Sequence, residues 1–240
     1  MHATRLEPSA ASAPPRDPFT MRLAGIAGLV AGLGFLPQPL LVFALPAPDG
    51  AEFWPPERMP ELSTRITVQA LAWGLFAAAL LVLVIALGRM TGGALGSIGT
   101  AFGVIGAASW LAEAAWRLIP LSMPAQHLTE APVGAATQGS ILFFLDLADY
   151  GWTALGAIGL GAWRLTLIGA RDALPRWLRV LAAIVGAVDV VTVFLLPSLP
   201  FGLALMFPLF AVIGVVLLRR SRETVAPSEL PSAGGARGGA

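Results

Sequence analysis

The apolar residues of this 240-residue chain fall into six long runs, separated by shorter stretches rich in proline, arginine and acidic residues. An α-helix needs about 20 predominantly apolar residues to cross the ~30 Å hydrocarbon core of a bilayer, and these runs have about that length. We therefore predict an all-α fold, a polytopic bundle of six transmembrane helices. The predicted spans cover residues 23–45, 66–87, 94–118, 139–165, 177–196 and 201–218.

Stretches of a different composition flank the apolar runs. Residues 1–21 are rich in proline, alanine and serine, and residues 221–240 end in a glycine-rich segment, so we predict that both are disordered tails. We expect the six-helix transmembrane domain between them, over residues 22–220. The first run is longer than the core of a cleaved signal peptide, which usually has about 7–15 residues, and we interpret it as a span.

Composition narrows the class of protein further. The chain is 56% hydrophobic and 12% charged, whereas soluble domains carry about 25% charged residues. A net charge of +1 does not provide the excess of positive charge that is typical of proteins that bind nucleic acid. With no cysteine and only His2 and His127, disulfides and thiolate metal sites are excluded. We find no catalytic motif and expect no enzyme activity, no cofactor and no metal, with the lipid bilayer as the main partner.

Arginine is distributed unevenly between the two sides of the predicted bundle. Six spans place both termini on one side, and twelve arginines then lie on that side against three on the other. Short arginine-rich loops stay in the cytoplasm, so we predict cytoplasmic termini and a location in the cell membrane. The twelve include four that we assign to the connection between the fourth and fifth spans: Arg164, Arg171, Arg176 and Arg179.

Carboxylates occur inside the apolar runs, where a charge costs at least ~2.5 kcal/mol on insertion scales. With the orientation fixed, a rise of ~1.5 Å per residue places four of them in the outer half of the bilayer. They are Glu113 in the third run, Asp146 and Asp149 in the fourth, and Asp189 in the fifth. Arg117 follows Glu113 at i+4 on the same helix face, and we expect it to be the available counter-charge.

These acids allow a functional and a structural interpretation. Four acids and one base cannot all stay ionised in hydrocarbon, so the excess acids should be protonated or face an aqueous cavity. The functional hypothesis is a small carrier or sensor that binds a proton or small cation in an outward-facing acidic pocket. Asp146, Asp149 and Asp189 would be its ligands, with Glu113 and Arg117 as a rim pair. In the structural interpretation, the aspartates only hydrogen-bond between helices.

Glycines recur at helical spacing in the first and third runs. Small residues at such spacing let two helices approach closely. We therefore expect tight helix–helix contacts along these faces. The alternative function is a non-catalytic structural or regulatory membrane subunit that packs against partners through its glycine-rich faces. The two stripes consist of Gly25, Gly28 and Gly32, and of Gly92, Gly96, Gly99, Gly103 and Gly106.

Two segments carry a resemblance to a known family. They read FLDLADYGW at 144–152 and LPRWLRVLAAIVGAVD at 174–189, with FLLP at 194–197 and an RLAGIAGLV opening at 22–30. This pattern resembles the uncharacterised bacterial membrane family called domain of unknown function 4386. Such proteins tend to carry a histidine where this chain has Ala148. The resemblance implies six helices and a bacterial inner membrane, and no established activity. The matching positions are Asp146, Tyr150, Gly151, Pro175, Leu178, Asp189 and Pro197.

Overall fold

The computed structural model describes residues 17–34, 59–116, 118, 133–195 and 201–225. These residues form six α-helices and one short 3-10 helix, and none of them forms a strand, so the predicted all-helical class is confirmed here. The α-helices are α1 (Pro18–Leu33), α3 (Met59–Thr91), α4 (Gly93–Trp116), α7 (Val133–Thr166), α8 (Arg176–Leu195) and α9 (Phe201–Val225); the 3-10 helix η3 covers Leu167–Gly169.

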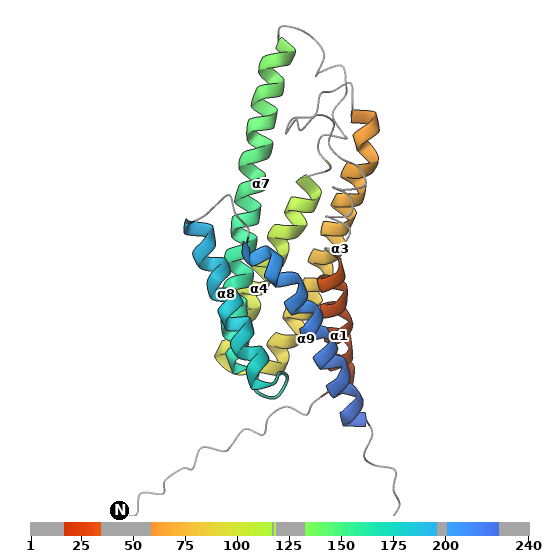
Figure 1. The fold of residues 1–240 in the computed structure, drawn as a ribbon, viewed down its shortest axis with the longest axis vertical. Coiled ribbons are helices and arrows are strands. Elements are labelled where there is room, and N and C mark those ends of the chain that lie inside the picture. The colour runs from red at the N-terminus through yellow and green to blue at the C-terminus, as the bar shows by residue number, and fades with distance from the viewer. Residues whose placement is uncertain (1–16, 35–58, 117, 119–132, 196–200, 226–240) are drawn as a thin grey trace, which may run out of the picture.

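The six α-helices are arranged as a closed ring of neighbours. Each contacts the next one along the chain, and α1 closes the ring against α9. The direction alternates, so that α1 begins and α9 ends at the same end of the bundle, the lower end in Figure 1. Contact is most extensive between α1 and α9 and least extensive between α8 and α9. The seam between α8 and α9 is therefore the loosest in the ring.

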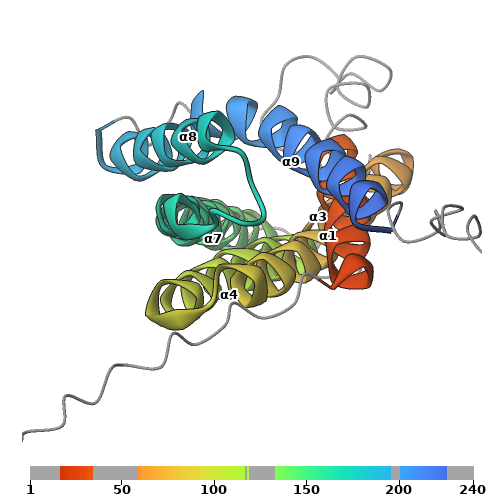
Figure 2. The same ribbon diagram turned by 90° about the horizontal axis from the view of Figure 1, so that it is seen from below.

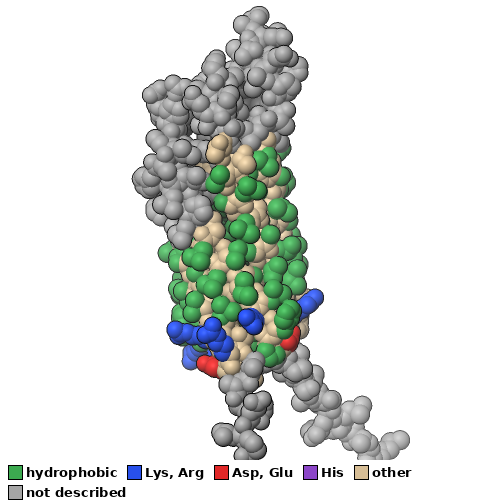
Figure 3. Space-filling view, turned by 90° about the vertical axis from the view of Figure 1, so that its right-hand side faces the viewer, with side chains coloured by type: hydrophobic (Ala, Val, Ile, Leu, Met, Phe, Trp, Pro, Cys, Tyr) green, Lys and Arg blue, Asp and Glu red, His purple; other side chains and the backbone are tan. Residues whose placement is uncertain are grey.

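Three helical segments are long and apolar enough to cross a membrane. They are Thr67–Thr91 of α3, Gly93–Trp116 of α4 and Arg176–Leu195 of α8, while α1 is apolar but shorter. The outward faces of these helices expose large apolar side chains, among them Leu75, Ile105 and Ile184. Figure 3 shows hydrophobic side chains spread over the described part of the visible face, above an end that carries arginines. A continuous apolar surface of this kind marks a lipid-facing protein.

The helices extend past several predicted boundaries. α1 begins at Pro18, inside the stretch predicted to be a disordered tail, and α9 continues to Val225. Proline suits the first turn of a helix, and the carboxylate of Asp17 caps this turn by accepting from the backbone N–H groups of Phe19 and Thr20, each at 3.1 Å. Backbone hydrogen bonds need no apolar side chain, so a helix can continue beyond the hydrophobic stretch that signals it.

One glycine pair forms the turn between α3 and α4. Gly92 and Gly93 have φ angles of +66° and +57°, in the left-handed region that L-residues rarely adopt. The amide of Gly92 donates to the carbonyl oxygen of Gly88 at 3.1 Å, which closes the last turn of α3. Gly92, predicted as part of a packing stripe, therefore serves as a turn residue.

The remaining glycines of the two predicted stripes pack helix against helix within the chain. A Cβ atom on Gly28 would lie 2.9 Å from the Cα of Gly214, so α1 and α9 touch backbone to backbone. On the other side of the ring, a Cβ on Gly106 would lie 2.8 Å from the backbone nitrogen of Leu160 in α7. The expectation of tight helix contacts at these glycines is confirmed.

The α1–α9 contact gives a first prediction. Replacing Gly28 by alanine should destabilise the bundle by about 1–3 kcal/mol, because the new methyl group meets backbone that cannot move aside. Gly74→Ala is the matched control, because the nearest atom to its added Cβ lies 4.0 Å away. Thermal unfolding in detergent should show a lower Tm for Gly28→Ala and an unchanged or higher one for Gly74→Ala. Equal Tm values would contradict the close approach.

The cap of α1 gives a prediction about pH. The hydrogen bond from the Thr20 hydroxyl, aided by the backbone N–H groups of Phe19 and Thr20, lowers the pKa of Asp17 below its ordinary value. Stabilisation by this carboxylate is present above the ordinary pKa and is lost as pH falls through the lowered one. Hydrogen exchange at the Phe19 and Thr20 amides, relative to amides in mid-helix, should therefore become less protected in acid. Asp17→Asn should remove this pH dependence.

Candidate functional site: a buried arginine–aspartate pair

An ion pair joins α7 to α8 in the interior of the bundle. The Nη2 atom of Arg164 contacts the Oδ2 atom of Asp189, and the two side chains are 0% and 1% exposed. On sequence grounds Arg164 belongs to the cytoplasmic connection, and Arg117 is the available counter-charge. Both assignments are wrong for this pair, because Arg164 is buried and neutralises Asp189.

Two glycines allow α7 and α8 to approach closely enough for this pair. A Cβ on Gly186 would lie 2.5 Å from the carbonyl oxygen of Gly161 and 2.9 Å from the Cβ of Arg164. Any larger residue at position 186 would push the helices apart. The small residues thus create the close contact beside which Arg164 and Asp189 meet.

Helix geometry directs the two side chains toward each other. In an α-helix each Cα–Cβ bond tilts toward the helix N-terminus. α7 and α8 run in opposite directions, so Arg164 leans away from the arginine-rich end of the bundle and Asp189 leans back toward it. Asp189 lies 13 residues after the start of α8, a distance of roughly 20 Å along its axis. The pair is therefore deep within the length of a membrane-crossing helix.

The connection after α7 explains why sequence reasoning placed Arg164 at the surface. The predicted span ended at residue 165, but the following segment is also partly buried: Leu167, Ala170 and Leu174 are at most 1% exposed. This segment packs at the base of the bundle, and Arg164 lies above it. Apolar neighbours along the chain do not distinguish Arg164 from Arg179, which stands between Leu178 and Val180, so the sequence gives no local signal of this burial.

Aromatic side chains cover the pair. The guanidinium carbon of Arg164 lies 5.7 Å from the ring centroid of Phe210 in α9, a cation–π arrangement that contributes up to about 2 kcal/mol when water is excluded. Phe210 also contacts Trp163, with ring centroids 6.1 Å apart. On α3 and α4, Trp73 and Trp110 stack with centroids 4.7 Å apart and an interplanar angle of 10°. The stacked tryptophans belong to the same buried apolar cluster as Trp163 and Phe210.

The pair is only partly compensated by hydrogen bonds. Apart from the contact with Asp189, the Nε and Nη1 atoms of Arg164 have no hydrogen-bond partner among the described residues, nor does Oδ1 of Asp189. A buried guanidinium normally satisfies more of its five N–H donors. Because each unsatisfied buried donor carries a desolvation cost, the contact with Asp189 offsets only part of the cost of burying Arg164.

The other predicted site residues divide into one that is described and three that are not. Glu113 is fully buried on the inner face of α4, three residues after Trp110. Asp146 and Asp149 belong to α7, but their side chains lie outside the described residues, and so does Arg117. Convergence of the four acids stays a prediction. No group of three histidine or carboxylate side chains able to hold a metal occurs among the side chains that the structure describes.

Comparison with known proteins adds no identity. No family model matches the chain, and no curated protein or solved structure matches it. Membership in the 4386 family therefore stays a prediction, and the argument about function depends on the geometry of the pair.

Removing one charge at a time should cost more than removing both. Arg164→Met or Asp189→Leu alone should destabilise the bundle by about 3–5 kcal/mol, because each leaves a lone charge in an apolar interior. The double variant should restore most of this loss, since a buried pair can be replaced by apolar residues at little cost. Thermal unfolding of the four proteins in detergent forms a double-mutant cycle. Additive losses would show that the two charges do not interact.

Proposed function

We propose that the chain is a multi-pass cell-membrane carrier or sensor whose conformation is linked to a proton at Asp189. In this proposal the bundle has six spans and cytoplasmic termini. Arginines support the orientation, because those described outside the buried pair gather at the end where α1 begins and α9 ends (Figure 3). Moving Arg164 into the interior leaves eleven arginines against three in the count from the sequence.

The observation that carries the proposal is the fully buried pair of Arg164 and Asp189. Ionisable residues within membrane helices are expensive and usually mark a pathway or a relay. The pair also favours a proton over a metal cation at this position. A cation approaching Asp189 would meet the charge of Arg164 at contact distance, whereas a proton adds to the carboxylate itself and removes its charge.

Protonation of Asp189 would change the balance between two arrangements of α7 and α8. The proton enters as a free ion from the outer side and forms an O–H bond on the carboxylate, while Arg164 keeps its charge and loses its counter-ion. A lone buried charge of this kind costs about 3–5 kcal/mol. A conformation in which Arg164 reaches water or another acceptor then becomes favoured, and the proton shifts the population toward it.

The second candidate is a structural or regulatory membrane subunit, in which the ion pair is a fixed link between helices. The packing of the described glycines argues against the surface first suggested for it, because the Gly28 and Gly106 contacts lie within the chain. A partner would have to use the lipid-facing side chains instead. Glu113, Asp146 and Asp149 remain candidate residues for binding a small cation.

Proton movement in reconstituted vesicles tests the proposal. The purified full chain is placed in proteoliposomes that contain a pH-sensitive dye, and a pH gradient is imposed with the membrane potential clamped. We expect the native protein to dissipate the gradient faster than empty vesicles, and Asp189→Asn to reduce that rate at least tenfold. Glu223→Gln, an exposed acid on the last turns of α9, is the matched control and should leave the rate unchanged.

The outcomes separate the two candidates. Proton movement that survives in Asp189→Asn would exclude this carboxylate as the proton site. If Glu113→Gln then abolished proton movement, Glu113 would be the proton site instead. If the native protein moves no protons in either gradient direction and shows no pH-dependent change in hydrogen exchange on α7 and α8, the structural subunit is the better description.

A further inference from the structure

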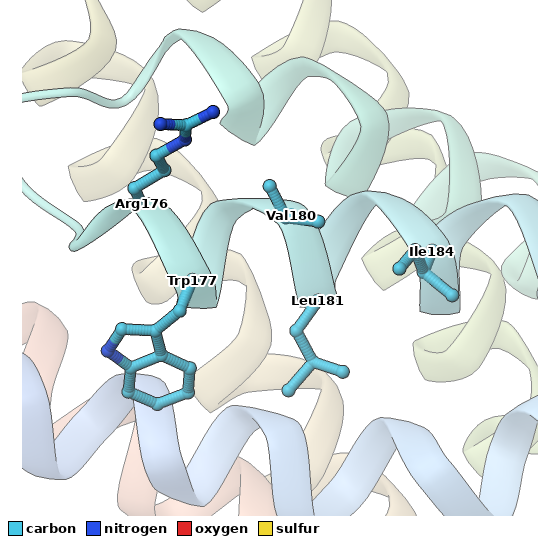
Figure 4. Close-up of a pocket in the computed structure, with 5 residues that line it drawn as sticks. All are labelled: Arg176, Trp177, Val180, Leu181 and Ile184. Carbon is cyan, nitrogen blue, oxygen red and sulfur yellow. The ribbon is translucent and has the colours of Figure 1, made fainter.

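A groove on the outer side of α8 combines one basic side chain with several apolar ones and is separate from the buried pair. It is a shallow depression of about 640 Å³, widely open to the surroundings, and it is lined by five residues of α8, one basic and four apolar. Figure 4 shows Trp177 and Leu181 pointing to the side on which α9 lies, whereas Arg176, at the start of the helix, points the opposite way. The lining residues are Arg176, Trp177, Val180, Leu181 and Ile184.

The groove lies where the ring of helices is least tightly closed. α8 and α9 contact each other less than any other neighbouring pair in the ring. Trp177 and Ile184 are each 56% exposed in the structure, so large apolar surfaces remain open to the surroundings here. A volume of this size is within the range of about 300–1,000 Å³ that is typical of small-molecule sites.

Arg176 provides a free positive charge at the mouth of the groove. Two of its neighbours are already engaged with backbone: Arg179 donates to the carbonyl oxygen of Ile168 at 2.7 Å, and Arg220 donates to that of Asp172 at 2.9 Å. Arg176 makes no hydrogen bond or ion pair with the described residues and is exposed. No described residue therefore takes up the donors of its guanidinium, and they can serve a ligand.

The end of the bundle around Arg176 is strongly basic. The described arginines at this end exceed the acids, which are Asp17, Asp172 and Glu223. Figure 3 shows basic side chains gathered at this end, below the apolar face. A ligand that fits both features must combine an anionic group with a long apolar part. The arginines are Arg22, Arg89, Arg171, Arg176, Arg179, Arg219, Arg220 and Arg222.

We propose that the groove on α8 binds an anionic phospholipid of the cytoplasmic leaflet. The phosphate would accept hydrogen bonds from the guanidinium of Arg176, and an acyl chain would lie along Trp177, Leu181 and Ile184. Arginine suits a phosphate because its planar fork donates two parallel hydrogen bonds. Tryptophan suits the depth, because its amphipathic ring is favoured at the boundary between headgroups and hydrocarbon. The inference depends on the proposed membrane orientation and not on the proton role of Asp189.

Native mass spectrometry of the full chain tests this inference. The protein is delipidated in detergent and titrated with phosphatidylglycerol or with phosphatidylcholine of the same acyl chains. We expect the native chain to bind the first lipid at least tenfold more tightly than the second. Arg176→Gln should remove about tenfold of that preference, because it loses charge-assisted hydrogen bonds.

Two further variants keep the result interpretable. Arg222→Gln removes an exposed arginine at the same end that does not line the groove, and it should cost no more than about fivefold, the contribution of one basic residue near an anionic surface. Ile184→Trp fills the groove from an exposed position and should weaken binding of both lipids.

Equal effects of Arg176→Gln and Arg222→Gln would leave only a general electrostatic attraction and overturn the site. Equal affinity for the two lipids would overturn the anionic preference, and unchanged binding by Ile184→Trp would overturn the groove.

The failure of this inference can be told apart from the failure of the proposed function. Lipid binding is measured without a pH gradient and needs no proton transfer, so Asp189→Asn should keep the preference for phosphatidylglycerol over phosphatidylcholine. A chain that moves protons and shows no lipid preference would overturn the groove alone. A chain that binds the lipid and moves no protons would overturn the role of Asp189 alone.

Discussion

A charge cannot stay alone in an apolar interior, and this constraint governs how α7, α8 and α9 are placed. Burial of Arg164 removes its hydration, and the cost is offset only if a counter-charge lies in contact with it. Asp189 supplies that charge from α8, and Phe210 supplies a ring face from α9. Three helices are thus brought to one point. The remaining unsatisfied donors of Arg164 mean that the described residues offset this cost only in part.

The glycines make this placement possible. Side chains on a helix surface normally keep helix axes about 8–10 Å apart, a spacing at which short side chains such as aspartate reach only part of the way across. Gly161 and Gly186 bring the backbones of α7 and α8 into contact, and Gly28 with Gly214 does the same where the ring closes. In hydrocarbon there is little hydrophobic gain from helix association, so such backbone contacts and the ion pair have to supply it. The loose α8–α9 seam has neither device among the described residues.

Features that depend on the local composition of the chain can be predicted from the sequence. Contacts between segments that are distant along the chain cannot. The helical class follows from run length, and the contacts at Gly28 and Gly106 follow from glycine spacing. The helix ends differ from the predicted ones because they are determined by caps such as Asp17 and by backbone hydrogen bonds. The length of the apolar run does not determine them. The partner of Asp189 could not be found, because Arg164 stands at the end of an apolar run and its burial depends on how the next segment folds beneath it. The groove depends in the same way on how loosely α8 meets α9.

The two proposed sites lie on one helix and are mechanically connected by it. Asp189 lies on the inner face of α8, whereas Trp177 and Leu181 lie on its outer face, roughly 18 Å and 12 Å nearer the start of the helix at ~1.5 Å per residue. A rigid helix transmits a tilt from one end to the other. A lipid along the face of α8 that carries Trp177 and Leu181 would oppose movement of α8 toward α9, and breaking the ion pair would remove the tie that holds α8 against α7. The occupancy of the groove would then alter the free-energy difference between the paired and unpaired states of Asp189, which is the reciprocal coupling that defines an allosteric effect. In this scheme the loose seam is what lets α8 move at all, because the tighter glycine contacts elsewhere in the ring fix the other helices.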